Sequence, residues 1–182
     1  QAGQAMVSAF IALSLVSATG NWVLAMIVAT LAGFLIGAVA YLVVQGALRS
    51  EGESGALIAS LGLLAVLQAG AAMIWGGEIR SFPAPVSTDG LRIGDTTLLL
   101  SRYDVLVLVV AGSLAALLTF FMQRTRLGLA MRAAAFNGEV ARISGVRTGR
   151  MLLLGWAIAG AIGGIGGVLI APGKITDFCP IY

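Results

Sequence analysis

Long apolar runs separated by short polar segments dominate the chain. Five such runs occupy residues 5–18, 22–44, 55–75, 103–122 and 151–171. A helix needs about 20 residues to cross the roughly 30 Å hydrocarbon layer of a bilayer, and the last four runs reach that length. The first run is shorter, so we expect a truncated, broken or re-entrant helix there. The pattern predicts an all-α, polytopic transmembrane helical bundle, forming one domain over residues 1–182, with four full spans and one shorter N-terminal membrane helix.

Composition points to the same class of protein. Hydrophobic residues make up 59% of the chain and charged residues only 10%, whereas a soluble domain carries about 25% charged residues. Disordered chains are poor in apolar residues, so disorder is excluded. The chain has no histidine and one cysteine, which excludes an intrachain disulfide, His-dependent nucleophilic catalysis and His-ligated metals. We therefore expect no catalytic residues, no metal site and no enzyme activity in this chain.

Arginine placement predicts the orientation in the membrane. Segment 123–150 carries six arginines against the single acid Glu139, and alternation of the spans puts Arg49 of loop 45–54 on the same face. The opposite face has fewer basic residues, namely Arg80, Arg92, Arg102 and Lys174. By the positive-inside rule the Arg-rich loop 123–150 is cytoplasmic, in a multi-pass protein of the inner cell membrane. We interpret the basic balance as this signature and expect no nucleic-acid partner.

The outer loop 76–102 is rich in turn signals. Pro83 and Pro85 flank an extended stretch, and Asp89-Gly90 precedes an alternating segment at 91–93. This pattern predicts a small β-hairpin. Two interpretations stay open, a solvated connector and a docking surface for a soluble partner.

The cytoplasmic segment 125–150 has the spacing of an amphipathic helix. An apolar ridge at intervals of three and four residues shares one helical face; it consists of Leu129, Ala133, Phe136, Val140 and Ile143. Asn137-Gly138 predicts a break, and Gly145 suits a left-handed cap at the end of a second short helix. The ridge could rest on anionic lipid headgroups or insert into a groove on a soluble cytoplasmic protein.

Small and polar residues inside the spans are the remaining candidates. The last span contains small-xxx-small pairs that favour close helix packing, or a sliding face; they are formed by Gly160, Gly163, Gly164 and Gly167. Gln4 and Gln68 place amides at membrane depth, where an amide needs an interhelical partner or a wet cavity. Both are therefore candidates for a translocation path. Asp104 lies near the outer interface and is a poor proton relay.

Residues 125–146, TRLGLAMRAAAFNGEVARISGV, resemble the coupling region of ABC importer permeases of the branched-chain amino acid, binding-protein-dependent type. The matching positions are Gly128, Ala130, Arg132, Ala133, Asn137, Ala141, Gly145 and Val146. The span WAIAGAIGGIGGVLIAP, the outer stretch FPAPVSTDGLRIGD and the opening GQAMVSAFIAL are similar to further parts of that family. In two respects the chain departs from the general permease motif, because Arg132 replaces its Glu and its later Ile-x-Leu-Pro is absent. Family chains are longer at both ends, so we expect an internal piece of a longer chain.

The resemblance implies a membrane-spanning permease subunit of an ATP-driven (ABC) importer for branched-chain or related amino acids. Its implied partners are cytoplasmic ATP-binding subunits, a second permease subunit that is identical or different, an extracytoplasmic solute-binding protein and the lipid membrane. No cofactor is expected in this chain, because the ATPase subunits bind the ATP. The expected ATPase-coupling residues are Arg132, Ala133, Ala134, Phe136, Gly138, Glu139, Val140 and Gly145.

Three alternatives stay open at this point. A secondary transporter or channel for a small solute needs no ATPase, although such proteins commonly carry intramembrane acids. An ABC permease for urea or short amides would share the same coupling region. A scaffold that transports nothing would use the Arg-rich helix only as a lipid anchor.

Overall fold

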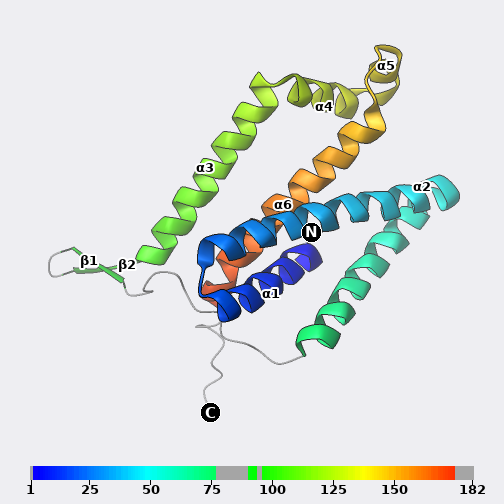
Figure 1. Cartoon of the computed structure of the whole chain (residues 1–182). Coiled ribbons are helices and arrows are strands. Elements are labelled where there is room, and N and C mark those ends of the chain that lie inside the picture. Colours follow the sequence, from blue (N-terminus) through cyan, green and yellow to red (C-terminus); the bar gives the residue numbers. More distant parts are fainter. Residues whose placement is uncertain (1, 77–89, 94–95, 175–182) are drawn as a thin grey trace.

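The computed structural model describes residues 2–76, 90–93 and 96–174 (Figure 1). Within these ranges the chain forms six helices and one two-stranded hairpin. The elements are α1 (Ala2–Thr19), α2 (Trp22–Trp75), β1 (Gly90–Ile93), β2 (Thr96–Ser101), α3 (Arg102–Arg124), α4 (Arg126–Phe136), α5 (Gly138–Ile143) and α6 (Thr148–Lys174). The predicted all-α class is confirmed for the membrane-length part of the chain.

Four described helices are long and apolar enough to cross a membrane, namely α1, α2, α3 and α6 through Ala171. Helix α2 has 54 residues, and its backbone leaves the helical region at Gly52, where φ is 70° and ψ is −155°. This kink folds α2 back on itself (Figure 1), giving a first arm at 22–51 and a second arm at 53–75. The reversal between the two arms falls at Gly52, inside the predicted loop 45–54, but the residues on both sides of that glycine are helical. No proline interrupts segment 45–54, so the helix continues on both sides of Gly52.

Helices α1, α2 and α6 pack into one bundle. Its buried centre is made of small and β-branched side chains, namely Ala12, Val16, Ala25, Ala29 and Val168. Between α1 and the second arm, the Trp75 indole N–H donates to Ser14 Oγ at 2.6 Å while its ring stacks on Phe10. Small core residues allow the helix axes to approach closely, which favours dispersion contacts in lipid.

Four glycines form a close backbone contact between α2 and α6, and we call them the glycine seam: Gly33 and Gly37 of α2 with Gly160 and Gly164 of α6. A Cβ atom built on Gly160 would collide with the Gly33 carbonyl oxygen and lie 2.9 Å from Gly37 Cα. One built on Gly164 would lie 2.8 Å from the Ala29 carbonyl oxygen. The two backbones therefore meet without intervening side chains, which only glycine permits.

The other two glycines of the predicted packing set behave differently. A Cβ atom on Gly167 would collide with the Ala5 carbonyl oxygen of α1, so this glycine serves a second close approach. A Cβ atom on Gly163 meets nothing within 4 Å in the described part of the chain. Within the described residues, Gly163 therefore takes no part in a close backbone approach.

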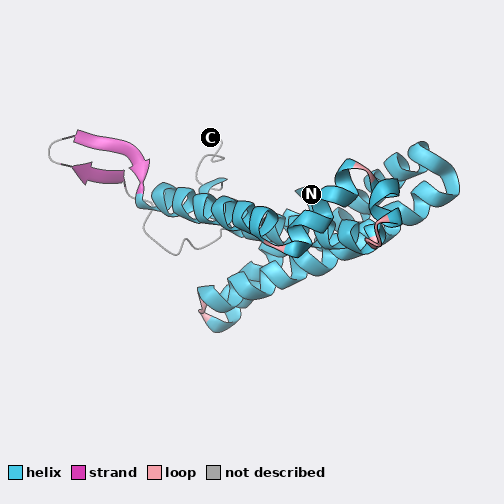
Figure 2. Ribbon diagram, turned by 90° about the horizontal axis from the view of Figure 1, so that it is seen from above, coloured by secondary structure: helices cyan, strands magenta, loops and turns pink. Residues whose placement is uncertain are grey.

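Helix α3 stands apart from the α1–α2–α6 bundle (Figures 1 and 2), and Tyr103 is its one buried residue. The Tyr103 hydroxyl donates to the Leu169 carbonyl oxygen of α6 at 2.6 Å. A capping box starts the helix, with the Ser101 backbone N–H donating to Asp104 Oδ2 at 2.9 Å. Asp104 therefore serves as a helix cap at this end of α3.

Strands β1 and β2 pair antiparallel, with Arg92 opposite Thr97 and Ile93 opposite Thr96. The hairpin extends beyond the first turn of α3 (Figure 2). The structure thus contains the hairpin that the turn signals predicted. Pro83 and Pro85, which belong to the same prediction, lie outside the described residues.

Candidate functional site

The connection between α3 and α6 folds into two short helices that meet at one asparagine. The Asn137 backbone N–H donates to the Ala133 carbonyl oxygen at 3.1 Å and so closes α4. Its side-chain Oδ1 accepts from the backbone N–H groups of Glu139 and Val140, both at 3.1 Å, and so opens α5. The break therefore falls where the sequence predicted it. Asn137 fixes the angle between the two helices, because one residue caps both of them.

Both ends of this connection are also fixed locally. Thr125 Oγ1 accepts from the Gly128 N–H at 3.0 Å and begins α4. A Cβ atom on Gly128 would lie 2.6 Å from Met122 Cα, so the tight turn out of α3 requires glycine there. Gly145 has φ of +84°, the left-handed conformation expected at the end of α5.

The apolar ridge of this connection lies open. Phe136 is 95% exposed and Ile143 is 84% exposed, and the side chains of Leu129, Ala133 and Val140 are exposed as well. Large apolar side chains gathered on one surface mark a protein or membrane contact. We call α4 and α5 with this exposed ridge the coupling segment.

The predicted coupling residues separate into two groups. Arg132, Glu139 and Gly145 are exposed beside the ridge, and Gly138 is half-buried in the first turn of α5. Ala134 is buried, so its side chain faces the rest of the chain and not a partner. Sequence reasoning placed it with its neighbours because the motif is contiguous, whereas a helix turns Ala134 away from the ridge.

All six arginines of segment 123–150 are exposed, so the segment that carries the ridge is strongly basic. They are Arg124, Arg126, Arg132, Arg142, Arg147 and Arg150. The surface is thus both apolar and basic, which fits an acidic protein groove or an anionic lipid surface.

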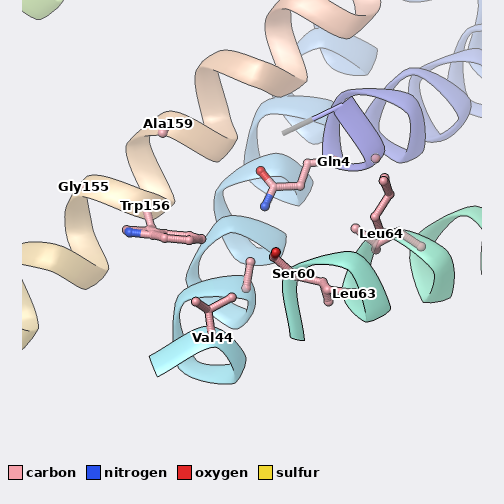
Figure 3. Close-up of a pocket in the computed structure, with 11 residues that line it drawn as sticks. Gln4, Val44, Ser60, Leu63, Leu64, Gly155, Trp156 and Ala159 are labelled. Atoms are coloured by element: carbon pink, nitrogen blue, oxygen red, sulfur yellow. The ribbon is translucent and has the colours of Figure 1, made fainter. Parts of the chain in front are cut away.

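A cavity of about 280 Å³ lies between α1, the two arms of α2 and α6 (Figure 3). Its wall is mostly aliphatic and contains no charged side chain; the lining residues are Gly3, Gln4, Ala40, Val44, Ser60, Leu63, Leu64, Leu67, Gly155, Trp156 and Ala159. Figure 3 shows the Gln4 amide and the Ser60 hydroxyl facing the same space from different helices. The Trp156 ring borders that space with its carbon edge, and its nitrogen points away.

The two glutamines predicted for a translocation path differ in their position relative to the cavity. Gln4 is 7% exposed and lines the cavity. Gln68 is exposed and does not line it. Leu63, Leu64 and Leu67 of the second arm line the cavity. On a helix with 3.6 residues per turn, Gln68 is rotated by about 90° from the average direction of these three side chains, so it lies off the face that lines the cavity.

Several site residues were not predicted. Ser60 and Trp156 line the cavity, and sequence reasoning did not select them for the path because each looked like an ordinary member of an apolar span. Two buried hydroxyls, Ser8 Oγ and Tyr41 Oη, have no hydrogen-bond partner in the described part of the chain. Ser8 Oγ lies 3.2 Å from the Cβ position of Gly164, so it borders the glycine seam.

Membrane-length helices, an exposed basic segment between two of them and an uncharged pocket between helices define a polytopic α-helical membrane protein. Residues 1–176 match the family model described as the permease component of the branched-chain amino acid transport system. The match spans nearly the whole chain, so the chain belongs to this family, and the predicted resemblance is confirmed. It is a transport component embedded in a membrane. Neither the curated proteins nor the solved structures give a match.

Proposed function

We propose that this chain is the membrane-spanning permease subunit of an ATP-driven importer for branched-chain amino acids. In this proposal the coupling segment is cytoplasmic and binds an ATPase subunit. The ATP is bound by that subunit and not by this chain. A second permease subunit completes the pathway, and a solute-binding protein docks at the outer loop. The observation that carries the proposal is the exposed ridge of the coupling segment, centred on Phe136.

The way the coupling segment is attached favours a protein partner over a simple lipid anchor. Helix α4 packs against both α3 and α6. Met131 Cε of α4 lies 3.3 Å from the Cβ position of Gly155 in α6. A lipid anchor needs no firm connection to a span, whereas a lever does. A force on Phe136 would reach α6 through this contact and through the Asn137 cap.

The test is Phe136→Asp in the assembled transporter. Burying a phenylalanine side chain contributes about 1.5–3 kcal/mol, and a buried carboxylate without a partner adds a further cost. We expect the ATPase to bind at least about tenfold more weakly, so less of it copurifies and ATP-dependent leucine uptake falls. Phe136 is exposed, so the variant should still insert in the membrane.

Ala135→Asp is the matched control, because Ala135 is also exposed but lies off the ridge. It adds the same charge one residue away and should keep the ATPase. Unchanged ATPase recovery and uptake in Phe136→Asp would contradict the proposal. Uptake that survives ATP depletion but stops when an ion gradient collapses would favour a secondary transporter.

Orientation is tested separately with Ser144→Cys, an exposed position just after α5. Cys179 is first replaced by serine, so that only one thiol remains. A membrane-impermeant maleimide should label the introduced cysteine in inverted vesicles and not in intact cells. Labelling from the outside would place the coupling segment on the wrong face for an ATPase.

A further inference from the structure

We propose that α3 and α6 hold one anionic phospholipid of the inner leaflet between them. Its acyl chains lie along the facing apolar sides of the two helices. Its phosphate lies at Arg124 and Arg126, where α3 turns into α4. The proposal rests on the proposed function in one respect, since it takes the coupling segment to be cytoplasmic.

Helices α3 and α6 meet at the end away from the coupling segment and separate toward it. At the near end the Tyr103 hydroxyl donates to the Leu169 carbonyl oxygen at 2.6 Å. The other ends are joined through α4 (Figure 1), whose 11 residues cover about 16 Å at 1.5 Å per residue. Packed helices lie only about 8–10 Å apart. Because α3 packs on α4 and β2, and α6 on α1, α2, α4 and α5, the sides that face each other are left without a helical neighbour.

Both facing sides carry apolar residues at helical spacing. On α3 these residues follow Tyr103 at intervals of three and four and are half-buried; they are Val107, Val110, Leu114, Leu118 and Phe121. On α6 the same face carries Gly155, next to Met131 of α4, and Leu169, which accepts from Tyr103. Between those two contacts, at the same spacing, lie Ile158, Ile162 and Ile165. Sides without any charge suit hydrocarbon chains.

Positive charge lies at the turn between α3 and α4. Arg124 ends α3 and Arg126 begins α4, both are exposed, and neither forms an ion pair within the described part of the chain. They follow directly after a helix of membrane length, which puts them at the depth of lipid headgroups. A guanidinium group binds phosphate oxygens through two parallel hydrogen bonds. An anionic phosphate is therefore the ligand that this pair of arginines fits.

A lipid suits these helices better than a helix of a second copy does. A spanning helix has to cross the whole hydrocarbon layer of about 30 Å, and it would meet the contact between Tyr103 and Leu169 on its way. The acyl chains of one leaflet need only about half that depth. A second copy in the same orientation would also bring its own Arg124 and Arg126 to the same level, where like charges repel.

The bound phosphate would also stabilise the start of the coupling segment. The two arginines flank Thr125, whose Oγ1 accepts from the Gly128 N–H at 3.0 Å in the turn out of α3. One phosphate that accepts from both arginines would hold the end of α3 to the beginning of α4. The lipid would therefore help to fix the angle at which the coupling segment leaves the membrane.

The first test measures binding of phosphatidylglycerol and phosphatidylcholine to the purified protein by native mass spectrometry. The wild type should bind one phosphatidylglycerol more tightly than phosphatidylcholine. The double variant Arg124→Gln, Arg126→Gln should bind phosphatidylglycerol about thirtyfold more weakly, which corresponds to about 1 kcal/mol for each arginine. The control Arg142→Gln, Arg147→Gln removes the same charge from exposed positions outside this turn and should leave the affinity unchanged.

The second test locates the acyl chains with phosphatidylglycerol that carries a photoreactive diazirine in one chain, at one lipid per protein. Cross-links should fall on the facing sides of the two helices, at Leu114, Leu118, Ile158 and Ile162. Cross-links mainly at Leu108 and Val109, which are exposed on the opposite side of α3, would overturn the proposal.

Three other results would also overturn it. The first is equal affinity for the two lipids, or equal loss of affinity in the two double variants. The second is displacement of the lipid by inorganic phosphate at the same concentration, which would show a site for a free anion. The third is a disulfide-linked dimer of Leu114→Cys in membranes, with Cys179 replaced by serine, which would show that a second copy lies there. The lipid-binding measurements need no ATP, so loss of ATPase copurification would count against the proposed function and not against the lipid.

Discussion

Gly160→Ala tests whether the glycine seam holds α2 against α6. A Cβ atom at this position would collide with the Gly33 carbonyl oxygen and lie 2.9 Å from Gly37 Cα. Cβ contacts shorter than 3.0 Å essentially never occur in real structures. Both neighbours are backbone atoms, so no change of side-chain rotamer can relieve the collision. The two helices must move apart along the seam.

The magnitude follows from two opposing effects. Alanine is favoured over glycine inside a helix by about 0.5–1 kcal/mol. Overpacking a tight contact costs about 1–3 kcal/mol. Gly163→Ala has the same helical gain but no collision, because its Cβ would meet nothing within 4 Å in the described chain. The helical gain cancels in the comparison, so Gly160→Ala should be less stable than Gly163→Ala by about 1–3 kcal/mol.

The assay is unfolding by SDS in mixed micelles, followed by far-UV circular dichroism, which gives a free energy of unfolding for each variant. We expect Gly163→Ala to match or exceed the wild type and Gly160→Ala to fall below it. Equal free energies for the two alanine variants would refute the reasoning. They would show that the close approach of α2 and α6 does not limit stability.

Two further predictions concern the hydrogen bonds of individual side chains. Tyr103→Phe removes the donation to the Leu169 carbonyl oxygen and should lower the free energy of unfolding by about 0.5–1.5 kcal/mol. Tyr41→Phe should not lower it, because the Tyr41 hydroxyl is buried without a partner in the described residues; the same SDS titration compares the two. Asn137→Ala removes the cap of α5 and should cost about 1 kcal/mol locally, seen as roughly fivefold faster amide hydrogen exchange in α5. Asn137→Ser should restore slow exchange, and equal exchange in wild type and Asn137→Ala would contradict the role of the cap.

The spans were predictable because the bilayer fixes the length of an apolar helix whatever it packs against. The connections between the spans were less predictable than the spans themselves. Polar residues between 45 and 54 suggested a loop, but the first arm of α2 continues as a helix through these residues as far as the kink at Gly52. Polarity reports contact with water, and a helix end that extends into water stays helical if nothing breaks it. The chain reverses at Gly52, within the segment that the polar residues marked, but the sequence did not show that the reversal takes a single glycine.

Two local features of the coupling segment were predicted from sequence, the break at Asn137 and the left-handed glycine at Gly145. Asn137 and Gly145 act through their own backbone neighbours, so their roles can be read from a few residues of sequence. The motif alone did not show that the Ala134 side chain is buried; that also depends on the rotation of each residue around the axis of α4.

The cavity was harder to predict, because its wall comes from three helices. Gln4 and Gln68 give the same signal in sequence, an amide inside an apolar run. Only the crossing of α1 with the arms of α2 turns one amide inward and leaves the other exposed. Ser60 gives no signal at all, since a serine bonded to its own helix backbone is common in membrane spans.

Helix α6 connects all three features. It follows the coupling segment directly, lines the cavity at Gly155, and forms the seam at Gly160 and Gly164. Side chains that interdigitate resist sliding, whereas a seam of glycine backbones offers few such obstacles. Under the proposed function, a movement of α4 would therefore displace α6 along α2 and change the cavity wall. The close packing of α2 and α6 and the ability of α6 to slide along α2 therefore have the same cause, the glycine seam. A side chain added at Gly160 should slow ATP-dependent uptake, because it would collide with the Gly33 backbone and hinder that displacement.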